Sequence, residues 1–173
     1  MSRSTKGQLS IEYFVAMIIF IFFVVYFLFQ ISNLVPEFTG EMEVQRIRSE
    51  AYQISEIIIN SPGMPTNWNT LPYQQTVLFG LSNQTFNKTN LLSSSKMASM
   101  GSTCASLGQQ AIRSKLYTDL EMSMLIVDRT DGTPRLDCSA PRNDTRGFSV
   151  TVKRIVAFDD GRFGDLTLQM WRP

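Results

Sequence analysis

The sequence predicts an α+β protein in which a long N-terminal helix, first membrane-spanning and then amphipathic, packs on a small antiparallel β-sheet. Three observations support this prediction. No charged residue occurs from Tyr13 to Val35, apolar residues then recur at spacings of three and four as far as Ile58, and a period of two dominates the C-terminal end. These patterns are typical of a membrane span, a one-sided helix and half-buried strands.

The apolar run is long enough to cross a bilayer. Most residues from Phe14 to Phe29 are Phe, Val, Ile or Leu, and each favours insertion by roughly 0.3 to 0.6 kcal/mol. Their sum, on the order of 4 to 8 kcal/mol, exceeds the cost of the Glu12 carboxylate, which is at most about 3 kcal/mol. A cleaved secretory signal is the competing interpretation, but residues 30–37 lack its small-residue cleavage site.

The charges on either side of the run predict its orientation. Arg3 and Lys6 precede it, whereas Glu37, Glu41 and Glu43 follow it. By the positive-inside rule the N-terminus lies in the cytoplasm and the C-terminal part lies outside the cell. We therefore expect a single-pass membrane protein.

The helical pattern continues beyond the run. Pro36 and Gly40 predict a kink or a brief break, and Asn60-Ser61-Pro62-Gly63 ends the pattern. Between them one stripe of apolar residues comprises Val44, Ile47, Ala51, Ile54 and Ile58. We expect one long helix from Gln8 to about Asn60, with a membrane anchor and a separate linker helix as the alternative.

Residues 62–173 predict one extracellular α+β head domain, after a polar leader over residues 1–7 and the long helix over 8–61. Its expected elements are a short strand at 76–81, a loop with at most one helical turn at 83–103, a helix at 105–116, a strand at 120–127, and a hairpin formed by 148–158 and 166–171. The outer half of the long helix would cover one face of a sheet of three or four strands.

The composition argues against several classes of function. The chain contains no histidine, which removes Ser-His-Asp and Cys-His catalysis and the commonest metal ligand. Its net charge of +1, without a basic block, gives no support for a nucleic-acid partner. The turn Asp159-Asp160-Gly161, with Asp165, lacks the alternating ligands of an EF-hand calcium loop. We expect no catalytic activity, no metal and no cofactor.

Two kinds of covalent feature are expected outside the cell. Cys104 and Cys138 predict one disulfide, with two free buried cysteines as the alternative. Acceptor tripeptides for N-glycosylation begin at Asn83, Asn87 and Asn143. Such tripeptides often occur by chance, so the three asparagines are candidate sites only.

The start of the apolar run resembles a known signal. Lys6-Gly7-Gln8-Leu9-Ser10-Ile11-Glu12-Tyr13 and the run that follows resemble the class III signal peptide of archaeal type IV pilins, in which glutamine begins a Gln-x-Ser-x-Glu pattern. The resemblance covers about the first 30 residues. It implies a pilin-like fold, cleavage between Gly7 and Gln8 by a membrane prepilin peptidase, and polymerisation into a cell-surface filament.

The resemblance also implies an assembly chemistry for Gln8, Ser10 and Glu12. Cleavage would free the α-amine of Gln8, four residues before the Glu12 carboxylate. When apolar helices pack side by side in a fibre, such a carboxylate must be neutralised or paired, and a neighbour's amine is a suitable cation. Considered alone, Glu12 is more simply a headgroup-level carboxylate that gains modestly from the helix dipole.

The expected function is therefore that of a structural subunit, a major or minor pilin. Its expected partners are other copies or other pilins, the prepilin peptidase, the pilus assembly machinery and membrane lipid. The alternative with the same topology is a membrane-anchored extracellular binding or adhesion module that never polymerises.

Overall fold

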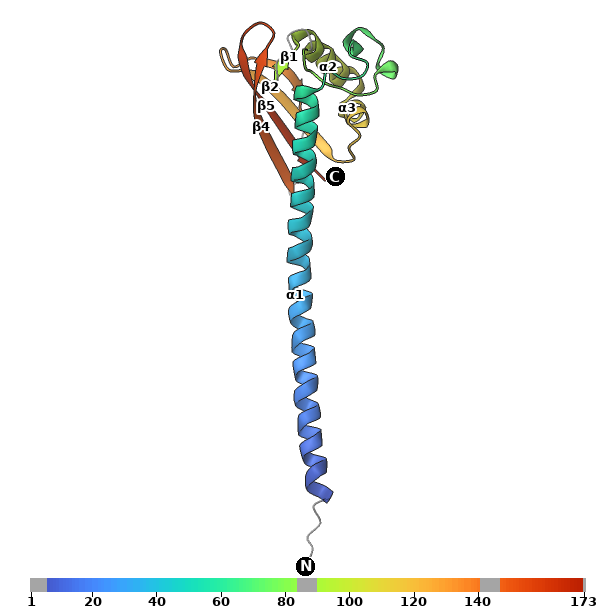
Figure 1. The fold of residues 1–173 in the computed structure, drawn as a ribbon, viewed down its shortest axis with the longest axis vertical. Coiled ribbons are helices and arrows are strands. Elements are labelled where there is room, and N and C mark those ends of the chain that lie inside the picture. The colour runs from blue at the N-terminus through green and yellow to red at the C-terminus, as the bar shows by residue number, and fades with distance from the viewer. Residues whose placement is uncertain (1–5, 84–89, 141–146, 173) are drawn as a thin grey trace, which may run out of the picture. The chain divides into compact units, whose positions relative to one another are not determined.

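The computed structural model describes residues 6–83, 90–140 and 147–172, and for residues 6–10 and 35–39 it describes the backbone only (Figure 1). The chain forms two compact units, Met1–Met42 and Glu43–Pro173. We call the second one the head unit. The boundary falls inside the long helix α1, Lys6–Asn60, so the head unit includes the C-terminal part of that helix.

Helix α1 continues through Pro36 and Gly40 without interruption. The expected break and the separate linker helix are therefore both wrong. The physical reason is that proline inside a helix removes one hydrogen bond, at a cost of about 3 kcal/mol, whereas a second helix would need a new and costly nucleus. Strongly helical sequence on both sides makes continuation the better solution.

The head unit contains a five-stranded mixed sheet in the order β1-β4-β5-β2-β3 (Figure 1). The strands are β1 (Leu91–Leu92), β2 (Glu121–Asp128), β3 (Pro134–Cys138), β4 (Ser149–Phe158) and β5 (Phe163–Trp171). β1 pairs with β4 in parallel, and the other neighbours are antiparallel. The predicted strand at 120–127 and the predicted hairpin are confirmed. The sheet has five strands rather than three or four, and the antiparallel sheet that was predicted is wrong in one respect, because β1 adds a parallel pair at the edge.

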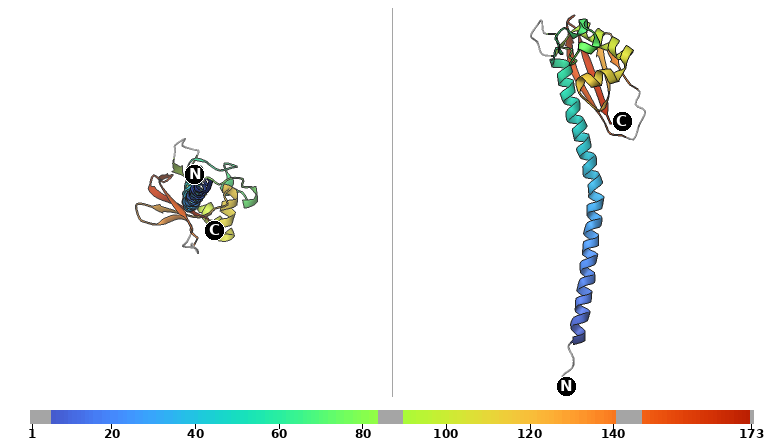
Figure 2. Two further views of the ribbon diagram at one scale, coloured as in Figure 1. Left: turned by 90° about the horizontal axis from the view of Figure 1, so that it is seen from below. Right: turned by 90° about the vertical axis from the view of Figure 1, so that its right-hand side faces the viewer.

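One face of this sheet, its inner face, is covered by residues 43–60 of α1 (Figures 1 and 2). Alternate residues of β2, β4 and β5 point into a single core that also contains Ile47, Ala51, Ile54 and Ile58, each at most 3% exposed. Two ion pairs join helix and sheet at the edges of this contact: Arg154 Nη2 lies 2.7 Å from Glu56 Oε1, and Arg172 Nη1 lies 3.0 Å from Glu43 Oε1. The predicted stripe is thus confirmed from Ile47 to Ile58, whereas its first residue, Val44, is only half-buried.

The head unit has more helix than the sequence predicts. α2 (Ser94–Leu107) occupies much of the region expected to be loop, and α3 (Gln109–Leu116) begins anew after Gly108, whose φ is 77°. The helix predicted at 105–116 is therefore divided. Tertiary contacts stabilise α2 despite its weak periodicity, because Met97 and Met100 are buried and Lys96 Nζ donates to Pro62 O at 2.6 Å.

The strand expected at 76–81 is replaced by two isolated bridges, Met64↔Leu78 and Ser82↔Leu92, after the short 3-10 helices Trp68–Thr70 and Tyr73–Gln75. The segment passes so close to the end of α1 that a Cβ on Gly80 would lie 2.2 Å from Ser61 O. Its backbone bonds are divided between the end of α1 and the region of β1, since Leu81 N donates to Ile58 O at 2.8 Å while Leu81 O accepts from Ser93 N at 2.8 Å. This close packing against the end of α1 explains why residues 76–81 do not form the predicted strand.

Candidate membrane and assembly segment

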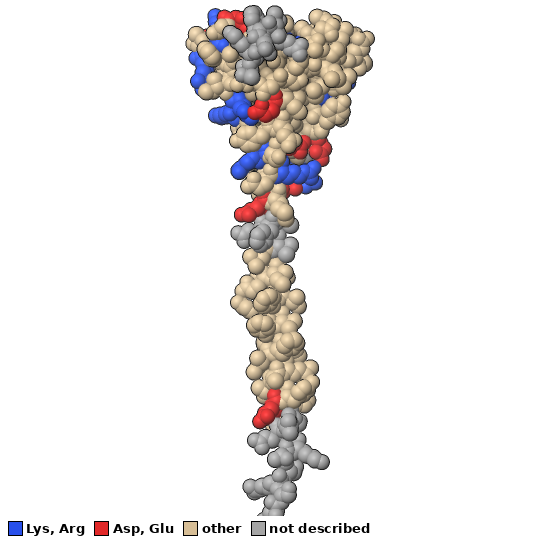
Figure 3. Space-filling view, viewed as in Figure 1, with Lys and Arg blue, Asp and Glu red and all other residues tan. Residues whose placement is uncertain are grey.

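The most distinctive surface of the chain is the segment Ile11–Leu34 of α1, which we call the apolar segment. It has a mean hydropathy of 2.8, and it is long and apolar enough to cross a membrane. Every side chain in it is exposed, and the exposed fraction of its large apolar residues ranges from 37% at Val24 to 72% at Phe22. Figure 3 shows its surface as tan apart from one acidic patch.

The length of the segment fits a bilayer. Its 24 residues would extend about 36 Å at 1.5 Å per residue, and the hydrocarbon core is about 30 Å thick. A continuous apolar surface of this size is unstable in water and marks a membrane or protein contact. One helix among the described residues is thus long and apolar enough to span a membrane, which is consistent with the single-pass arrangement that the sequence predicts.

The predicted processing and assembly residues lie at the N-terminal end of the same helix. Lys6, Gly7, Gln8 and Ser10 have helical backbone, and their side chains lie outside what the structure describes. Glu12 is exposed. Because α1 is regular here, Gln8 and Glu12 are four residues apart on one helical face. The helical spacing thus places Gln8 and Glu12 on the same side of α1.

The predicted disulfide is present. Cys104 of α2 is bonded to Cys138 at the end of β3, with their Cα atoms 5.8 Å apart. The alternative of two free cysteines is therefore wrong. The bond joins α2 to β3, an edge strand of the sheet. It therefore crosslinks to the sheet the helix that the sequence pattern predicts least clearly.

One of the three candidate glycosylation sites falls on described residues. Asn83 is half-buried, and its backbone N–H donates to Leu91 O at 2.8 Å. Asn87 and Asn143 lie outside the described residues. Modification of the three asparagines stays a prediction.

A charged cluster joins the β2–β3 turn to the β4–β5 turn. Asp128 is fully buried, and its carboxylate accepts hydrogen bonds from Arg135 Nη2 at 2.6 Å and from Thr130 N at 2.8 Å. These bonds, the one from Arg135 above all, hold the pKa of Asp128 far below its usual range. Arg135 also pairs with Asp160 at 2.7 Å. The hairpin turn around Asp160 is thus tied to a buried charge that sequence reasoning missed.

The cluster has a structural rather than a metal-binding composition. Its carboxylates are matched by guanidinium groups, with Arg162 Nη1 3.1 Å from Asp131 Oδ2. Within the described ranges, no group of three or more His, Cys, Asp and Glu side chains could hold a metal ion.

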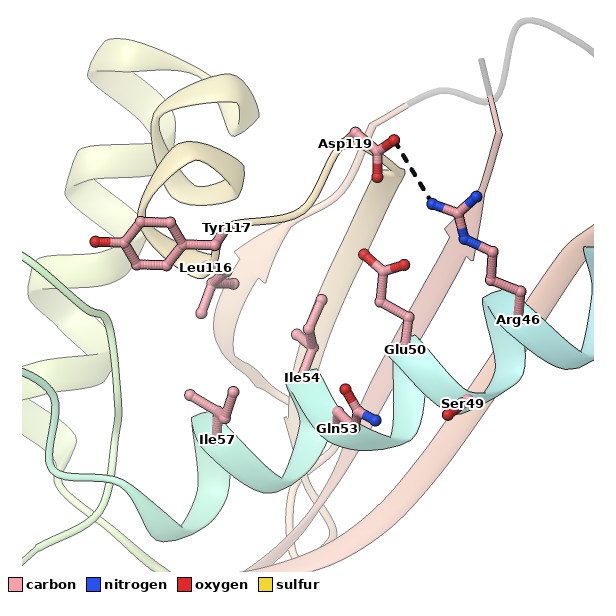
Figure 4. Close-up of a pocket in the computed structure, with 9 residues that line it drawn as sticks. All are labelled: Arg46, Ser49, Glu50, Gln53, Ile54, Ile57, Leu116, Tyr117 and Asp119. Carbon is pink, nitrogen blue, oxygen red and sulfur yellow. Dashed lines mark ion pairs between the residues drawn. The ribbon is translucent and has the colours of Figure 1, made fainter.

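The head unit also contains a groove between α1 and the turn that leads from α3 to β2 (Figure 4). Its volume is about 520 Å³, and its lining residues are Arg46, Ser49, Glu50, Gln53, Ile54, Ile57, Leu116, Tyr117 and Asp119. Tyr117 has a left-handed backbone, with φ 55°, and it is 75% exposed. Sequence reasoning did not anticipate the groove, because its two walls are far apart in the chain.

No family model matches this chain, and no curated protein or solved structure gives a significant match. The functional interpretation therefore rests on the residues and their geometry.

Proposed function

We propose that this chain is a structural subunit, a major or minor pilin, of an archaeal type IV pilus-like surface filament. In this proposal a prepilin peptidase cuts the chain after Gly7, and the subunit then polymerises through its N-terminal helix. The proposal rests on one observation. The Lys-Gly-Gln-x-Ser-x-Glu register lies directly at the start of an all-round apolar helix, with Glu12 as the only charged residue between Ile11 and Leu34.

The all-round exposure of the apolar segment supports two successive environments. Lipid can surround it before assembly, and apolar segments of other subunits can surround it afterwards, because neither environment requires one special face. The second part of α1 differs, since its apolar stripe is already covered by the sheet of its own head unit. The apolar segment is therefore the part of the helix that remains for polymerisation.

Glu12 gives this proposal a specific chemistry. A carboxylate inside an apolar fibre costs free energy unless a cation or hydrogen-bond donor partners it. Cleavage after Gly7 would create such a cation at the α-amine of Gln8, in every subunit, at nearly the same level of the helix. A Gln8 amine of one subunit paired with Glu12 of a neighbour would set the axial offset between them.

The decisive experiment combines N-terminal sequencing of the mature chain with analysis of purified surface filaments. We expect the mature chain to begin at Gln8 and to be a component of the filaments. Glu12→Gln keeps the size of the side chain and removes its charge, so we expect the processed protein to accumulate in the membrane with few filaments. Glu41→Gln, which removes a carboxylate outside the apolar segment, is the matched control and should assemble normally.

Other outcomes would contradict the proposal in identifiable ways. A mature N-terminus at Met1, or beyond Phe29, would refute the cleavage site. Normal assembly of the Glu12→Gln variant would refute the pairing role of Glu12. A chain that is processed and membrane-bound yet missing from purified filaments would support the alternative of a non-polymerising binding or adhesion module.

A further inference from the structure

The outer face of the sheet, opposite the face covered by α1, has two large apolar side chains that its own head unit leaves exposed. Ile155 of β4 and Phe163 of β5 are each 59% exposed. Ile155 pairs with Asp165 and Ala157 pairs with Phe163, so the two apolar residues are diagonal neighbours on one face, about 7 to 8 Å apart. We call Ile155 and Phe163 the knob.

The groove beside α1 has the composition of a protein-binding site. Ile57 supplies accessible apolar surface above the buried Ile54 and Leu116, and Arg46 and Tyr117 lie toward its two ends (Figure 4). Tyrosine and arginine are among the residue types that contribute most to protein interfaces. The volume of about 520 Å³ is within the range of sites that enclose apolar groups.

The backbone of Tyr117 is a second indication. A residue other than glycine in the left-handed region costs roughly 1 to 2 kcal/mol, and glycine or asparagine usually occupies this position after a helix. Tyr117 nevertheless adopts it, with φ 55°. Since its ring is 75% exposed, burial of the ring within its own chain does not account for a tyrosine here.

The charges around the two surfaces are complementary. The groove is lined by two carboxylates, Glu50 and Asp119, and one guanidinium, that of Arg46. The residues beside the knob have the opposite balance, because Lys153 and Arg129 accompany one carboxylate, Asp165, which lies 2.7 Å from Arg129 Nε. Opposite net charges favour encounter and register between the two surfaces.

We infer that the knob of one copy of this chain docks in the groove of a second copy. The inference rests on the proposed function, which brings many copies side by side. The knob lies on the outer face of the sheet and the groove lies beside the helix that covers the inner face, so one subunit offers its knob and the other its groove. Such a head-to-tail contact leaves a free knob and a free groove at the ends, and it can propagate along a filament.

Paired cysteines test the contact in whole cells. Gln53 is an exposed residue of the groove, and Ala157 is a partly exposed residue that pairs with Phe163 beside the knob. In cells that carry Gln53→Cys with Ala157→Cys, a membrane-permeant bismaleimide should produce a ladder of covalent multimers. The matched control combines Ala157→Cys with Ala98→Cys, an exposed position on α2, and it should give no ladder.

Charge reversal provides a second readout in the same cells. Adding Lys153→Glu to the Gln53→Cys and Ala157→Cys pair should remove most of the ladder, because the surroundings of the knob then become acidic like the groove. Adding Asp119→Lys as well should restore the ladder. Asp119 suits this change because its side chain is 79% exposed and lies 4.0 Å from its ion-pair partner Arg46. A merely structural role of Lys153 would not produce this rescue.

The outcomes separate this inference from the proposed function. Filaments that contain the chain, with equal crosslinking in the paired variant and the control, would overturn the docking inference and leave the filament proposal standing. If the chain is missing from filaments, the filament proposal fails, and the whole-cell ladder still decides the docking. Failure of Asp119→Lys to restore the ladder would overturn the assignment of the groove as the partner surface.

Discussion

Two regions of one helix, residues 11–34 and residues 43–60 of α1, differ in where their apolar side chains are placed. In the first region the apolar residues surround the helix and all are exposed. In the second they form one stripe, and Ile47, Ala51, Ile54 and Ile58 are buried in the head unit. The two regions therefore differ in how their apolar residues are distributed around the helix. The first region needs lipid or another protein to cover its apolar surface, whereas the second is covered by its own head unit.

The charged residues follow the same division. The first region has one charged residue, Glu12. In the second region the three glutamates have partners in the head unit, since Glu56 pairs with Arg154, Glu43 pairs with Arg172, and Glu50 accepts a hydrogen bond from Thr118 Oγ1 at 2.5 Å. The contacts of the second region are therefore made within its own fold, whereas those of the first region must come from its surroundings.

The largest effect should come from placing one charge in each region. Ile58→Asp introduces a carboxylate at a position with no exposed surface, so we expect it to destabilise the head unit by more than about 4 kcal/mol. Ile19→Asp makes the same change at a position that is 63% exposed, and it should leave the stability of the head unit unchanged.

Tryptophan fluorescence during denaturant unfolding in detergent would measure this difference, because the chain has two tryptophans and both Trp68 and Trp171 are buried in the head unit. Membrane insertion of Ile19→Asp should weaken by up to about 3 kcal/mol, measured by extraction of the membrane fraction. Equal loss of head-unit stability in the two variants would refute the division of α1 into two regions.

The disulfide should have the next largest effect, and it should act on the head unit alone. Replacing both Cys104 and Cys138 by serine removes a bridge between residues 34 apart, which the chain-entropy account values at about 3 to 4 kcal/mol. We expect a lower midpoint of fluorescence-detected unfolding and unchanged membrane association. A variant with wild-type stability would show that the packing of α2 on β3 suffices without the bond.

Sequence reasoning succeeded where structure follows from local periodicity. The 3,4 spacing predicts the stripe of α1 and the period of two predicts β2, β4 and β5, because each pattern reports which face of an element is buried. It failed for α2, whose Ser- and Met-rich sequence has no strong period and which depends on contacts such as that of Lys96 with Pro62. It also missed β3, whose first residue is a proline.

The candidate sites divide in the same way. The processing and assembly residues lie within one stretch of sequence, so spacing alone can relate Gln8 to Glu12. The groove and the cluster around Asp128 instead combine side chains from separate elements, such as Glu50 with Asp119 and Asp128 with Asp160. Such combinations depend on strand order and helix packing, which a single sequence does not specify.

Acid should separate the two regions by a third route. Hydrogen bonds and guanidinium partners lower the pKa of Asp128, Asp131, Asp160 and Asp165 in the folded head unit. A lowered pKa means that the folded state binds fewer protons than the unfolded state. The resulting stability is complete above the unfolded pKa of about 4, and it is lost progressively as the pH falls toward the folded pKa.

We therefore expect the fluorescence-detected stability of the head unit to decline below about pH 4 to 5, while far-UV circular dichroism in detergent retains the helical signal of the apolar segment. Asp128→Asn should lower the stability at pH 7 and flatten its decline in acid. Asp165→Asn should do so less, because Asp165 is partly exposed and its ion pair with Arg129 is screened by solvent. An unchanged pH dependence in Asp128→Asn would refute the role assigned to the buried carboxylate.

The smallest effect concerns Tyr117, and it tests whether a surface of the second region is reserved for a partner. Asparagine tolerates the left-handed backbone better than tyrosine does, and the ring of Tyr117 is 75% exposed. Tyr117→Asn should therefore raise the free energy of unfolding of the head unit by up to about 1 kcal/mol. The same change should reduce crosslinking between the groove of one copy and the knob of another. Tyr117→Phe, which keeps the ring, should leave both measurements as they are in the wild type. Opposite changes in stability and docking would show that the ring at this position serves an interaction between chains, whereas a loss of both in Tyr117→Asn would show that it serves the fold.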